Sequence, residues 1–212
     1  FAVAPASVLA PKPGSLTFAQ ASALPQAGPI ALQGTAGVGP GSRVAVNGAG
    51  GGSGSLAVQL AKAAGAHVTA VDNAGKLDFL RSLGADAVVD HRVEDVTRLG
   101  PFDLVLDLVA HRSVRDYRRA LAPGGRYLAV GGSVSTMLSL LTAGTVLGRV
   151  SGRRLGVLAV KPGPDHFIPL EARCASGEVR IHIDREVSLD EVPEALASVG
   201  EGRVLGKVVV TP

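Results

Sequence analysis

The chain has 212 residues, of which 46% are hydrophobic and 18% charged, so it carries enough apolar material for a folded core. The formal net charge is only +3 and aromatic residues make up 3%, which argues against a surface that stacks nucleic-acid bases. The single cysteine, Cys174, excludes a disulfide scaffold and an all-cysteine metal site. With roughly 150 residues per domain as a guide, the length suits one large domain, or one domain with part of another.

Short apolar strand patterns alternate with helical patterns through the middle of the chain. The spacing predicts strands at 43–47, 67–71, 87–90, 102–107, 126–130 and 155–160, and helices at 54–64, 76–83 and 113–121. Gly84 is typical of the residue that ends a helix. Strands and helices that alternate at this spacing form βαβ units, so we expect a parallel sheet covered by helices on both faces.

The two ends of the chain differ from this middle part. Residues 1–26 contain four prolines and have no clear periodicity. From about residue 161 the pattern predicts a helix, an extended run at 179–187, a helix at 189–199 and a strand at 206–210.

One run, residues 127–148, carries no charge and is long enough to span a bilayer. Glycine, serine and threonine are frequent in it, which favours a buried strand, a glycine turn and a partly buried helix over a membrane span. The chain also lacks the pattern of a secretory signal peptide. We therefore expect no membrane partner, no nucleic-acid partner and a cytoplasmic location.

The clearest chemical signal is the glycine-rich run 47–54, NGAGGGSG, where the first predicted strand meets the first helix. A dinucleotide needs a tight turn there, a backbone that approaches the pyrophosphate without a Cβ, and helix amides directed at the phosphates. In the usual G-x-G-x-x-G spacing, Ala49, Gly51 and Gly54 take the three positions, with alanine in the first.

An acidic residue follows the second predicted strand at the distance that this motif requires. Asp72 lies 21 residues after Gly51, where a carboxylate accepts hydrogen bonds from an adenosine ribose and repels a 2′-phosphate. Asp72 therefore favours NAD over NADP, although Lys76 offsets part of that repulsion. The alternative is that Asp72 only caps the next helix.

Methyltransferases that use S-adenosylmethionine share several of these features, so they are an alternative. They have a glycine-rich first turn, an acidic residue after the second strand, and runs similar to FDLVLD and LAPGGRYLAV. They usually have a carboxylate at the residue that enters the first turn, whereas this chain has Asn47. The spacing of the glycines also suits the pyrophosphate of a dinucleotide better than it suits S-adenosylmethionine.

Several runs together resemble one family closely: LAPKPGSLTFAQASALP, VAVNGAGGGSGSLAVQLAKAAGAHVTAVD, LRSLGADAVVDH, FDLVLDLVAHRS, LAPGGRYLAVGG and SLDEVPEALASVGEGRVLGKVVV. In this order they are similar to the zinc-independent medium-chain dehydrogenases/reductases, in the branch of the quinone oxidoreductases and NAD(P)-dependent alcohol dehydrogenases. The resemblance implies an α/β fold, a Rossmann-type doubly wound parallel sheet, with parts of a GroES-like β domain at both ends. It also implies an NAD(P)-dependent oxidoreductase of quinones, enones or related carbonyl compounds.

The resemblance implies the cofactor-binding residues one position at a time. The pyrophosphate is expected at Gly50, Gly51, Gly52, Ser53 and Gly54, and the adenosine ribose at Asp72, Asn73 and Lys76. Further along the chain we expect His91, Val109 and Ala110 at the adenosine end, Gly131 and Gly132 at the nicotinamide side, and Lys207 near the cofactor.

The resemblance also implies a domain division and departures from the family. Residues 1–26 correspond to the tail of the GroES-like catalytic domain, 27–160 to the dinucleotide-binding domain and 161–212 to the return to the catalytic domain. Most of that catalytic domain is absent from the sequence, so a non-catalytic NAD(P)-binding module is a second hypothesis. Relatives often have a threonine near Ile30, where isoleucine cannot hydrogen-bond the nicotinamide half.

The remaining candidate residues give no catalytic assignment. The histidines show no metal-ligand spacing and no ligand-type residue stands at 27–28, so we expect no zinc. Cys174 is typical of a small core residue, and Asp107 of one that caps a loop. His111 follows the fourth strand, where a proton carrier is possible but a solvated loop residue is favoured. We expect a small-molecule substrate and a possible homodimer.

Overall fold

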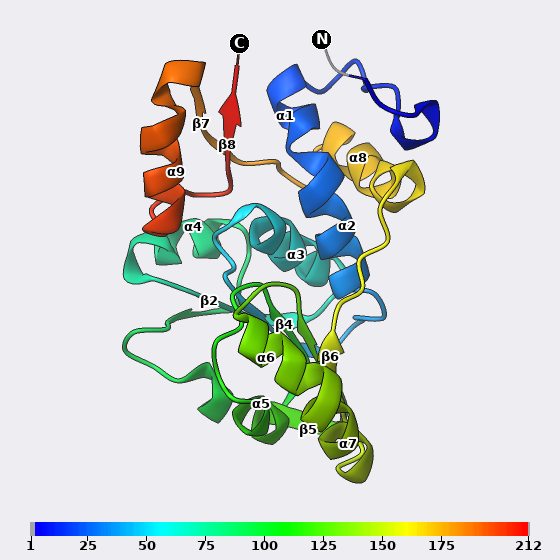
Figure 1. Ribbon diagram of the computed structural model, residues 1–212, viewed down its shortest axis with the longest axis vertical. Coiled ribbons are helices and arrows are strands. Elements are labelled where there is room, and N and C mark those ends of the chain that lie inside the picture. Colours follow the sequence, from blue (N-terminus) through cyan, green and yellow to red (C-terminus); the bar gives the residue numbers. More distant parts are fainter. Residues whose placement is uncertain (1–2, 212) are drawn as a thin grey trace.

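A computed structural model describes residues 3–211, with all of their side chains except that of Thr145. Its centre is a parallel sheet (Figure 1). The sheet has six strands in the order β3-β2-β1-β4-β5-β6. The chain winds outwards from β1 to β3 and then crosses back to β4, which is the topology of a Rossmann-type doubly wound sheet. The fold class predicted from the sequence is therefore confirmed. The strands are β1 (Arg43–Asn47), β2 (His67–Asp72), β3 (Ala87–Asp90), β4 (Phe102–Asp107), β5 (Leu121–Ala129) and β6 (Arg154–Val157).

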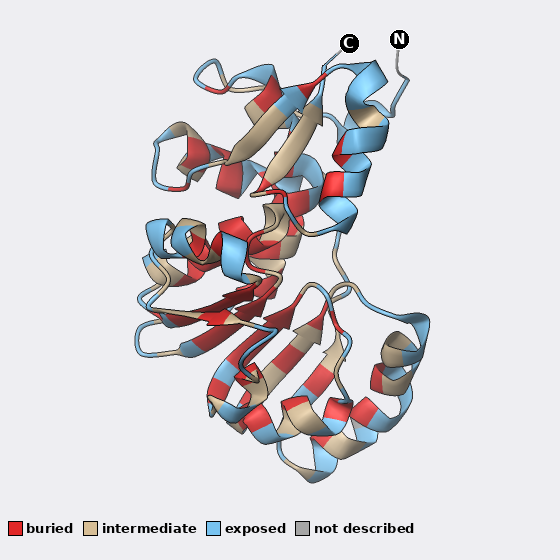
Figure 2. Ribbon diagram, turned by 90° about the vertical axis from the view of Figure 1, so that its left-hand side faces the viewer, coloured by how far each residue is buried: buried red, intermediate tan, exposed pale blue. Residues whose placement is uncertain are grey.

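Helices cover both faces of this sheet, and a hydrophobic core lies under each set. Val44 and Val46 of β1 belong to the core beneath the first set, whereas Ala45 between them belongs to the core beneath the second. Side chains alternate across a strand in this way, so a strand with both faces covered is apolar throughout. Figure 2 shows the buried residues concentrated in the sheet and on the inner sides of the helices. The first set is α2 (Leu24–Gly34), α3 (Gly52–Ala63) and α4 (Leu77–Ser82); the second is α5 (Val114–Ala120), α6 (Val134–Ser139), the π-helical turn η4 (Leu140–Gly144) and α7 (Thr145–Val150).

All six strands predicted for the sheet are present. The predicted ranges 43–47, 87–90 and 102–107 match the observed bounds, whereas β5 begins earlier and β6 ends earlier than predicted. The helices predicted at 54–64, 76–83 and 113–121 correspond to α3, α4 and α5. Gly84 ends α4 with a φ of +91°, a left-handed conformation that glycine adopts without a steric penalty, so this prediction is confirmed.

Helices precede the sheet at the N-terminal side. The 3₁₀ turn η1 (Ala6–Val8) is followed by α1 (Phe18–Ser22), and then by α2, which packs against α3. Thr17 begins α1 with a capping box, because its hydroxyl accepts from the Gln20 amide and the Gln20 side chain accepts from the Thr17 amide. The domain boundary expected between residues 26 and 27 falls inside α2, and the division into three parts stays a prediction.

The C-terminal part forms a separate small βαβ unit. The strands β7 (Ile183–Val187) and β8 (Lys207–Val210) pair in parallel, and α9 (Val192–Gly200) connects them. The extended run predicted at 179–187 is a strand only from residue 183. The helix expected after residue 161 is α8 (Ile168–Ala175), which follows the 3₁₀ turn η5 (Pro164–His166). The other 3₁₀ turns are η2 (Ala74–Lys76), η3 (Val96–Arg98) and η6 (Leu189–Glu191).

The uncharged run 127–148 divides among four elements. It contains the end of β5, all of α6 and η4, and the start of α7. Within residues 3–211, no helix combines the length and the apolar character needed to cross a membrane.

Candidate functional site: a glycine turn beside a charged cavity

The turn between β1 and α3 brings its backbone very close to the first turn of the helix. Gly48 has a φ of +77°, and its amide and that of Ala49 both donate to the carbonyl of Val71 in β2. A Cβ on Gly54 would lie 2.3 Å from the Gly48 oxygen, so this glycine allows the helix to pack on the turn. Gly51 caps α3, whose first amides have no acceptors within the helix. The positive end of the helix dipole and these amides together suit an anion such as a diphosphate.

Asp72, at the end of β2, is bonded to the turn itself. Its Oδ2 accepts the Gly50 amide at 2.8 Å, and its Oδ1 accepts the Asn73 amide at 2.9 Å. Lys76 Nζ lies 3.5 Å from Oδ1, and both side chains are buried. A Cβ on Gly50 would lie 2.5 Å from the Lys76 side chain, so a larger residue here would displace that lysine.

The next helical turn is capped by Asn73 and not by Asp72. Asn73 Oδ1 accepts the Gly75 amide at 3.1 Å at the start of η2. The alternative in which Asp72 only caps the following helix is therefore wrong. The Asp72 carboxylate instead connects the end of β2 to the glycine turn and borders the cavity described next.

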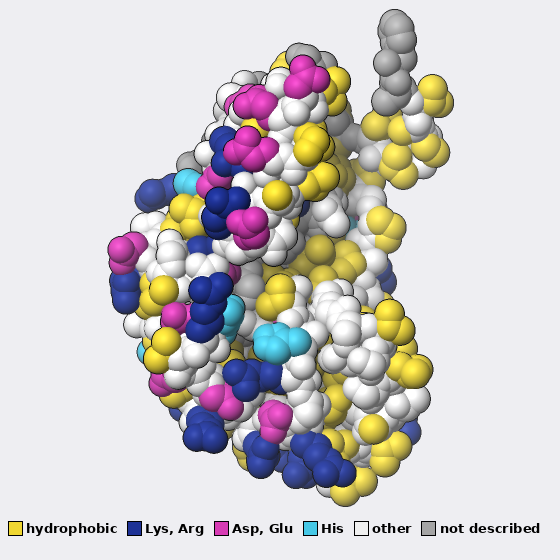
Figure 3. Space-filling model, turned by 60° about the vertical axis from the view of Figure 1, so that its left-hand side comes forward, with side chains coloured by type: hydrophobic (Ala, Val, Ile, Leu, Met, Phe, Trp, Pro, Cys, Tyr) yellow, Lys and Arg dark blue, Asp and Glu magenta, His cyan; other side chains and the backbone are white. Residues whose placement is uncertain are grey.

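A cavity of about 400 Å³ lies at the carboxyl ends of the strands, which is where open α/β sheets bind ligands. It collects predicted residues from four separate parts of the sequence, and basic and histidine side chains gather along this hollow (Figure 3). His111 also borders it, with its Nδ1 2.9 Å from the Val109 carbonyl oxygen. The predicted cofactor residues that line it are Gly51, Asp72, Asn73, Lys76, His91 and Val109.

Two groups of lining residues were missed by the sequence analysis. Arg92 follows His91 after β3. Its place could have been predicted, because the carboxyl ends of parallel strands meet at one edge of the sheet. Residues 199–202 come from the end of α9, and Asn73 Nδ2 donates to the Gly202 carbonyl at 2.9 Å. No sequence pattern indicated that this distant segment borders the cavity.

A neighbouring cavity of about 350 Å³ adjoins Gly51 and Gly52 on the other side, between the start of α3 and the C-terminal unit. The Gly206 amide donates to the Gly50 carbonyl at 2.8 Å, which places Lys207 over the helix start. A Cβ on Gly52 would lie 2.4 Å from Lys207 Cε. Within residues 3–211, the Lys207 ammonium has no ion-pair or hydrogen-bond partner, so an unpaired cation stands at the N-terminus of α3.

The other predicted cofactor residues lie outside the linings of these two cavities. Gly131 and Gly132 follow β5, and Ala110 and Gly132 form a parallel backbone bridge in which a Cβ on Gly132 would lie 2.2 Å from the Ala110 oxygen. Gly50 and Gly54 are packing positions of the turn. None of these residues, nor Ser53, lines the two cavities, and their contact with a cofactor stays a prediction.

Below the turn, a buried polar network joins the ends of three strands. The fully buried Asp107 of β4 accepts from Asn47 Nδ2 of β1 at 2.8 Å and from the Tyr127 hydroxyl of β5 at 2.9 Å. It also accepts the Val109 amide at 3.2 Å, so the expectation that it caps a loop is confirmed. Tyr117 stacks on Tyr127 with ring centroids 4.2 Å apart, and burial together with Asp107 raises the pKa of both tyrosines above their ordinary value. The side-chain amide of Asn47 thus donates its hydrogen bond to Asp107.

Comparison with known proteins decides the family. Residues 83–210 match the family model described as zinc-binding dehydrogenase. The whole chain is 30% identical to the chloroplast envelope quinone oxidoreductase homolog of Arabidopsis thaliana, of which it covers 68%. The chain belongs to the medium-chain dehydrogenase/reductase family. This membership confirms the resemblance to the medium-chain dehydrogenases/reductases and shows that the methyltransferase alternative is wrong. The independence from zinc stays a prediction.

Other members of the family are similar over nearly the whole chain. The 2-methylene-furan-3-one reductase of Solanum lycopersicum is 34% identical over 97% of this chain, which covers 50% of that reductase. The quinone oxidoreductase from Coxiella burnetii superposes with a TM-score of 0.84 and 29% identity, over 95% of this chain and 63% of that protein. This medium-chain dehydrogenase/reductase chain thus spans between half and about two thirds of the length of these relatives.

The catalytic acid or base stays unassigned. Within residues 3–211, no three His, Cys, Asp or Glu side chains are grouped so that they could hold a metal ion. Cys174 is buried, and burial raises the pKa of its thiol to about 11, which is typical of a core cysteine and not of a nucleophile.

Proposed function

We propose that this chain binds a nicotinamide dinucleotide and functions as an NAD(P)-dependent oxidoreductase. The reaction transfers a hydride to or from a quinone, an enone or a related carbonyl compound and uses no zinc. The observation that supports it most directly is the glycine turn, whose helix amides and unpaired Lys207 ammonium adjoin the cavities at the strand ends. The relatives named as a quinone oxidoreductase homolog and a 2-methylene-furan-3-one reductase support the substrate class.

The residues of the chain fit a dinucleotide in a defined way. The Gly52 and Ser53 amides at the start of α3 and the Lys207 ammonium hold the diphosphate. Asp72, Asn73 and Val109 border the cavity of about 400 Å³, where the two polar side chains would meet the ribose hydroxyls and Val109 would pack beside the adenosine. Gly131 and Gly132 give the nicotinamide end close access to the backbone. When bound, the dinucleotide supplies the hydride chemistry, and the protein supplies position and electrostatics.

Between the two coenzymes, we propose NAD. Asp72 borders the cavity, where its carboxylate would face the ribose and repel a 2′-phosphate. Arg92 and His91 border the same cavity, and Lys76 is paired with Asp72. The Asp72 carboxylate disfavours the 2′-phosphate of NADP, whereas the nearby basic groups reduce that preference for NAD. The ratio of kcat/KM for NADH and NADPH tests this preference, and a ratio that favours NADPH contradicts it.

The central experiment separates binding from turnover. The purified chain is titrated with NADH and NADPH by calorimetry, and is then mixed with each coenzyme and a panel of quinones and enones while the nicotinamide absorbance is followed. Saturable binding with oxidation of the coenzyme supports the proposal, and added zinc or a chelator is expected to leave the rate unchanged. Binding without oxidation favours the non-catalytic NAD(P)-binding module, and the absence of binding to both coenzymes refutes both hypotheses.

Three further expectations remain proposals. A homodimer is tested by light scattering. A cytoplasmic location is tested by fractionation, because the relatives include a chloroplast envelope protein and a mitochondrial one by name. A small carbonyl substrate is tested by the panel above.

A further inference from the structure

Two glutamine side chains each hold the backbone of a segment that is distant in the sequence. Gln59 of α3 donates from Nε2 to the Arg180 carbonyl at 3.0 Å, and its Oε1 accepts the Arg180 amide at 2.8 Å. Gln33 of α2 makes the same reciprocal pair with Lys161, at 2.9 Å for each bond. Because such a pair engages both the amide and the carbonyl of one residue, it fixes the position and the direction of the segment.

The segment that Gln59 holds connects α8 to β7, and Figure 1 shows its course between these two elements. Arg180 lies three residues before β7 begins. Gln59 Nε2 also donates to the Ser55 carbonyl of its own helix at 3.0 Å, so both hydrogens of this amide are in use. The side chain therefore has a fixed orientation and ties the segment before β7 to α3.

The same segment leads directly to Lys207. Two residues after Arg180, the His182 carbonyl accepts the Lys207 amide at 3.1 Å. A Cβ on Gly206 would lie 2.3 Å from this carbonyl oxygen, so the two backbones are in close contact. The first residues of α3, residues 181–182 and Lys207 surround a gap of only about 10 Å³. The place of Lys207 over the start of α3 therefore depends on where this segment lies.

Other contacts keep this part of the chain folded without the glutamine. Val179 is buried in the first hydrophobic core, and Ile181 packs against that core. The Gly206 amide donates to the Gly50 carbonyl independently of Gln59. Loss of the Gln59 pair is therefore expected to shift the segment and not to unfold it.

We propose that Gln59 is a positioning residue for the coenzyme, because it holds the Lys207 ammonium, through Arg180 and His182, where that ammonium meets the diphosphate. This inference rests on the proposed function, which places the diphosphate between the α3 amides and Lys207. Gln59 lines neither of the two cavities at the glycine turn, so it acts only through the backbone that it binds.

Calorimetry with NADH and thermal denaturation of the full chain test this role. Gln59→Met keeps most of the side chain and removes its hydrogen bonds, so the Kd for NADH should rise about two- to tenfold. Gln59→Ala removes the same bonds and should raise the Kd by a similar factor. The matched control is Gln33→Met, because Gln33 is also half-buried and neither it nor Lys161 lines the two cavities. It should lower the Tm about as much as Gln59→Met and leave the Kd unchanged.

A double-mutant cycle with Lys207→Met distinguishes positioning of the ammonium from a general structural effect. In the Lys207→Met background, Gln59→Met should cause no further rise in the Kd, because the charge that it positions is absent. In the wild-type background, Gln59→Met should also weaken the salt dependence of NADH binding, since a displaced ammonium contributes less to it. Gln33→Met should leave that salt dependence unchanged.

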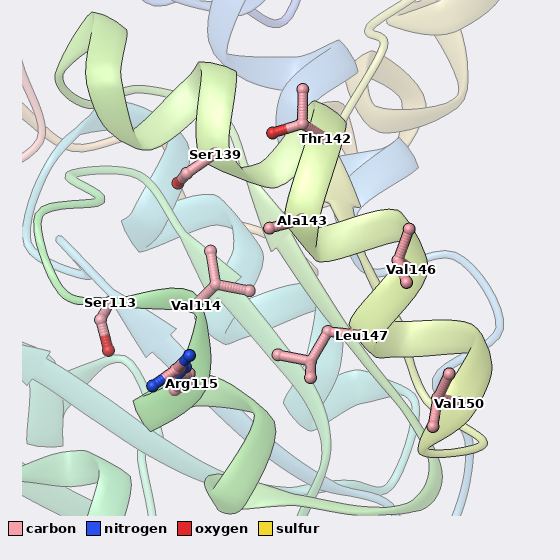
Figure 4. Close-up of a pocket in the computed structure, with 9 residues that line it drawn as sticks. All are labelled: Ser113, Val114, Arg115, Ser139, Thr142, Ala143, Val146, Leu147 and Val150. Atoms are coloured by element: carbon pink, nitrogen blue, oxygen red, sulfur yellow. The ribbon is translucent and has the colours of Figure 1, made fainter.

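A further control measures the effect of lost stability alone. Leu147 lines a groove of about 770 Å³ between α5 and α7, which shares no lining residue with the two cavities at the glycine turn (Figure 4). Leu147→Ala removes part of a half-buried apolar side chain, so it should lower the Tm. It should leave the Kd for NADH unchanged.

The possible results separate this inference from the proposed function. If the wild type binds NADH, the positioning role is overturned by an unchanged Kd in Gln59→Met, by an equal rise in Gln33→Met, or by additive effects in the cycle with Lys207→Met. The coenzyme site itself would then stand. If the wild type does not bind NADH, the proposed function fails and the positioning role fails with it.

Discussion

The two glycines at 51 and 54 allow stability and coenzyme binding to be separated. An alanine at Gly54 would place its Cβ 2.3 Å from the Gly48 oxygen and 2.6 Å from Ala49 Cα, and both are backbone atoms. Because both clashing atoms belong to the backbone, we take the upper end of the usual cost of overpacking, about 3 kcal/mol, of which the better helix propensity of alanine returns about 1 kcal/mol. The net loss is about 2 kcal/mol, and at about 2–4 °C for each kcal/mol in a chain of this size we expect Gly54→Ala to lower the Tm by about 4–8 °C and to weaken binding of NADH.

Gly51→Ala is the contrasting substitution. Its Cβ would meet only the Gly48 oxygen, at 3.6 Å, and the φ of −84° at this residue suits alanine. The free energy of unfolding should change by less than about 0.5 kcal/mol. The methyl group would extend into the space beside both cavities, where we place the diphosphate, so the Kd for NADH is expected to rise about tenfold or more, equal to about 1.4 kcal/mol.

Calorimetry measures the Kd for NADH and thermal denaturation measures the Tm of the two variants and of a control variant. Gly39→Ala is a suitable control, because a Cβ there would meet nothing within 4 Å. It should leave both the Tm and the Kd unchanged. If Gly51→Ala binds NADH as tightly as the wild type, the turn does not hold the diphosphate, and the reasoning about the site is refuted.

Three other predictions concern Lys207, the buried network and Cys174. Lys207→Met keeps the aliphatic chain over Gly52 and removes the charge, so the Kd for NADH should rise about 10- to 100-fold with a weaker dependence on salt; an unchanged Kd in calorimetry would contradict the assigned role. Asp107→Asn should lower the free energy of unfolding, measured in urea, by about 2–3 kcal/mol, because its amide group would face groups that now donate hydrogen bonds to Asp107. Tyr127→Phe should lower it by about 1 kcal/mol. Equal losses in the two variants would count against this network. Cys174 has a pKa of about 11 against 9.0 for the free group, so at pH 8 its thiolate should be about 100-fold scarcer in the folded chain, and alkylation should be slow until the pH approaches 11; reaction as fast as in the unfolded chain would show that the thiol is not buried.

Local patterns predicted the sheet because its physical causes are local. Apolar strands, helix-ending glycines and the run 47–54 are visible in short windows of sequence, and the parallel arrangement follows from their alternation. Asp72 was likewise found from its distance to the glycine turn. The bond from its carboxylate to the Gly50 amide was not predicted, because it depends on how two strand ends meet in space.

The part of the site that was missed comes from long-range packing. Gly202 and Gly206 are more than 120 residues away from the Asn73 side chain and the Gly50 carbonyl that they contact. No periodicity relates such segments. The resemblance placed Lys207 of the C-terminal unit near the cofactor, but it did not indicate that residues 199–202 border the cavity. The helical character of residues 18–34 was also missed, since α1 depends on one capping box and α2 contains Pro25 and Pro29.

The dual attachment of Asp72 limits how coenzyme choice can be re-engineered. A substitution that removes its carboxylate to admit a 2′-phosphate would also release the Gly50 amide and leave Lys76 without its counter-charge. Selectivity and the shape of the diphosphate cradle are thus coupled through one side chain. A redesign that begins at His91 and Arg92, which border the same cavity, would alter the preference while the anchor of the turn stays in place.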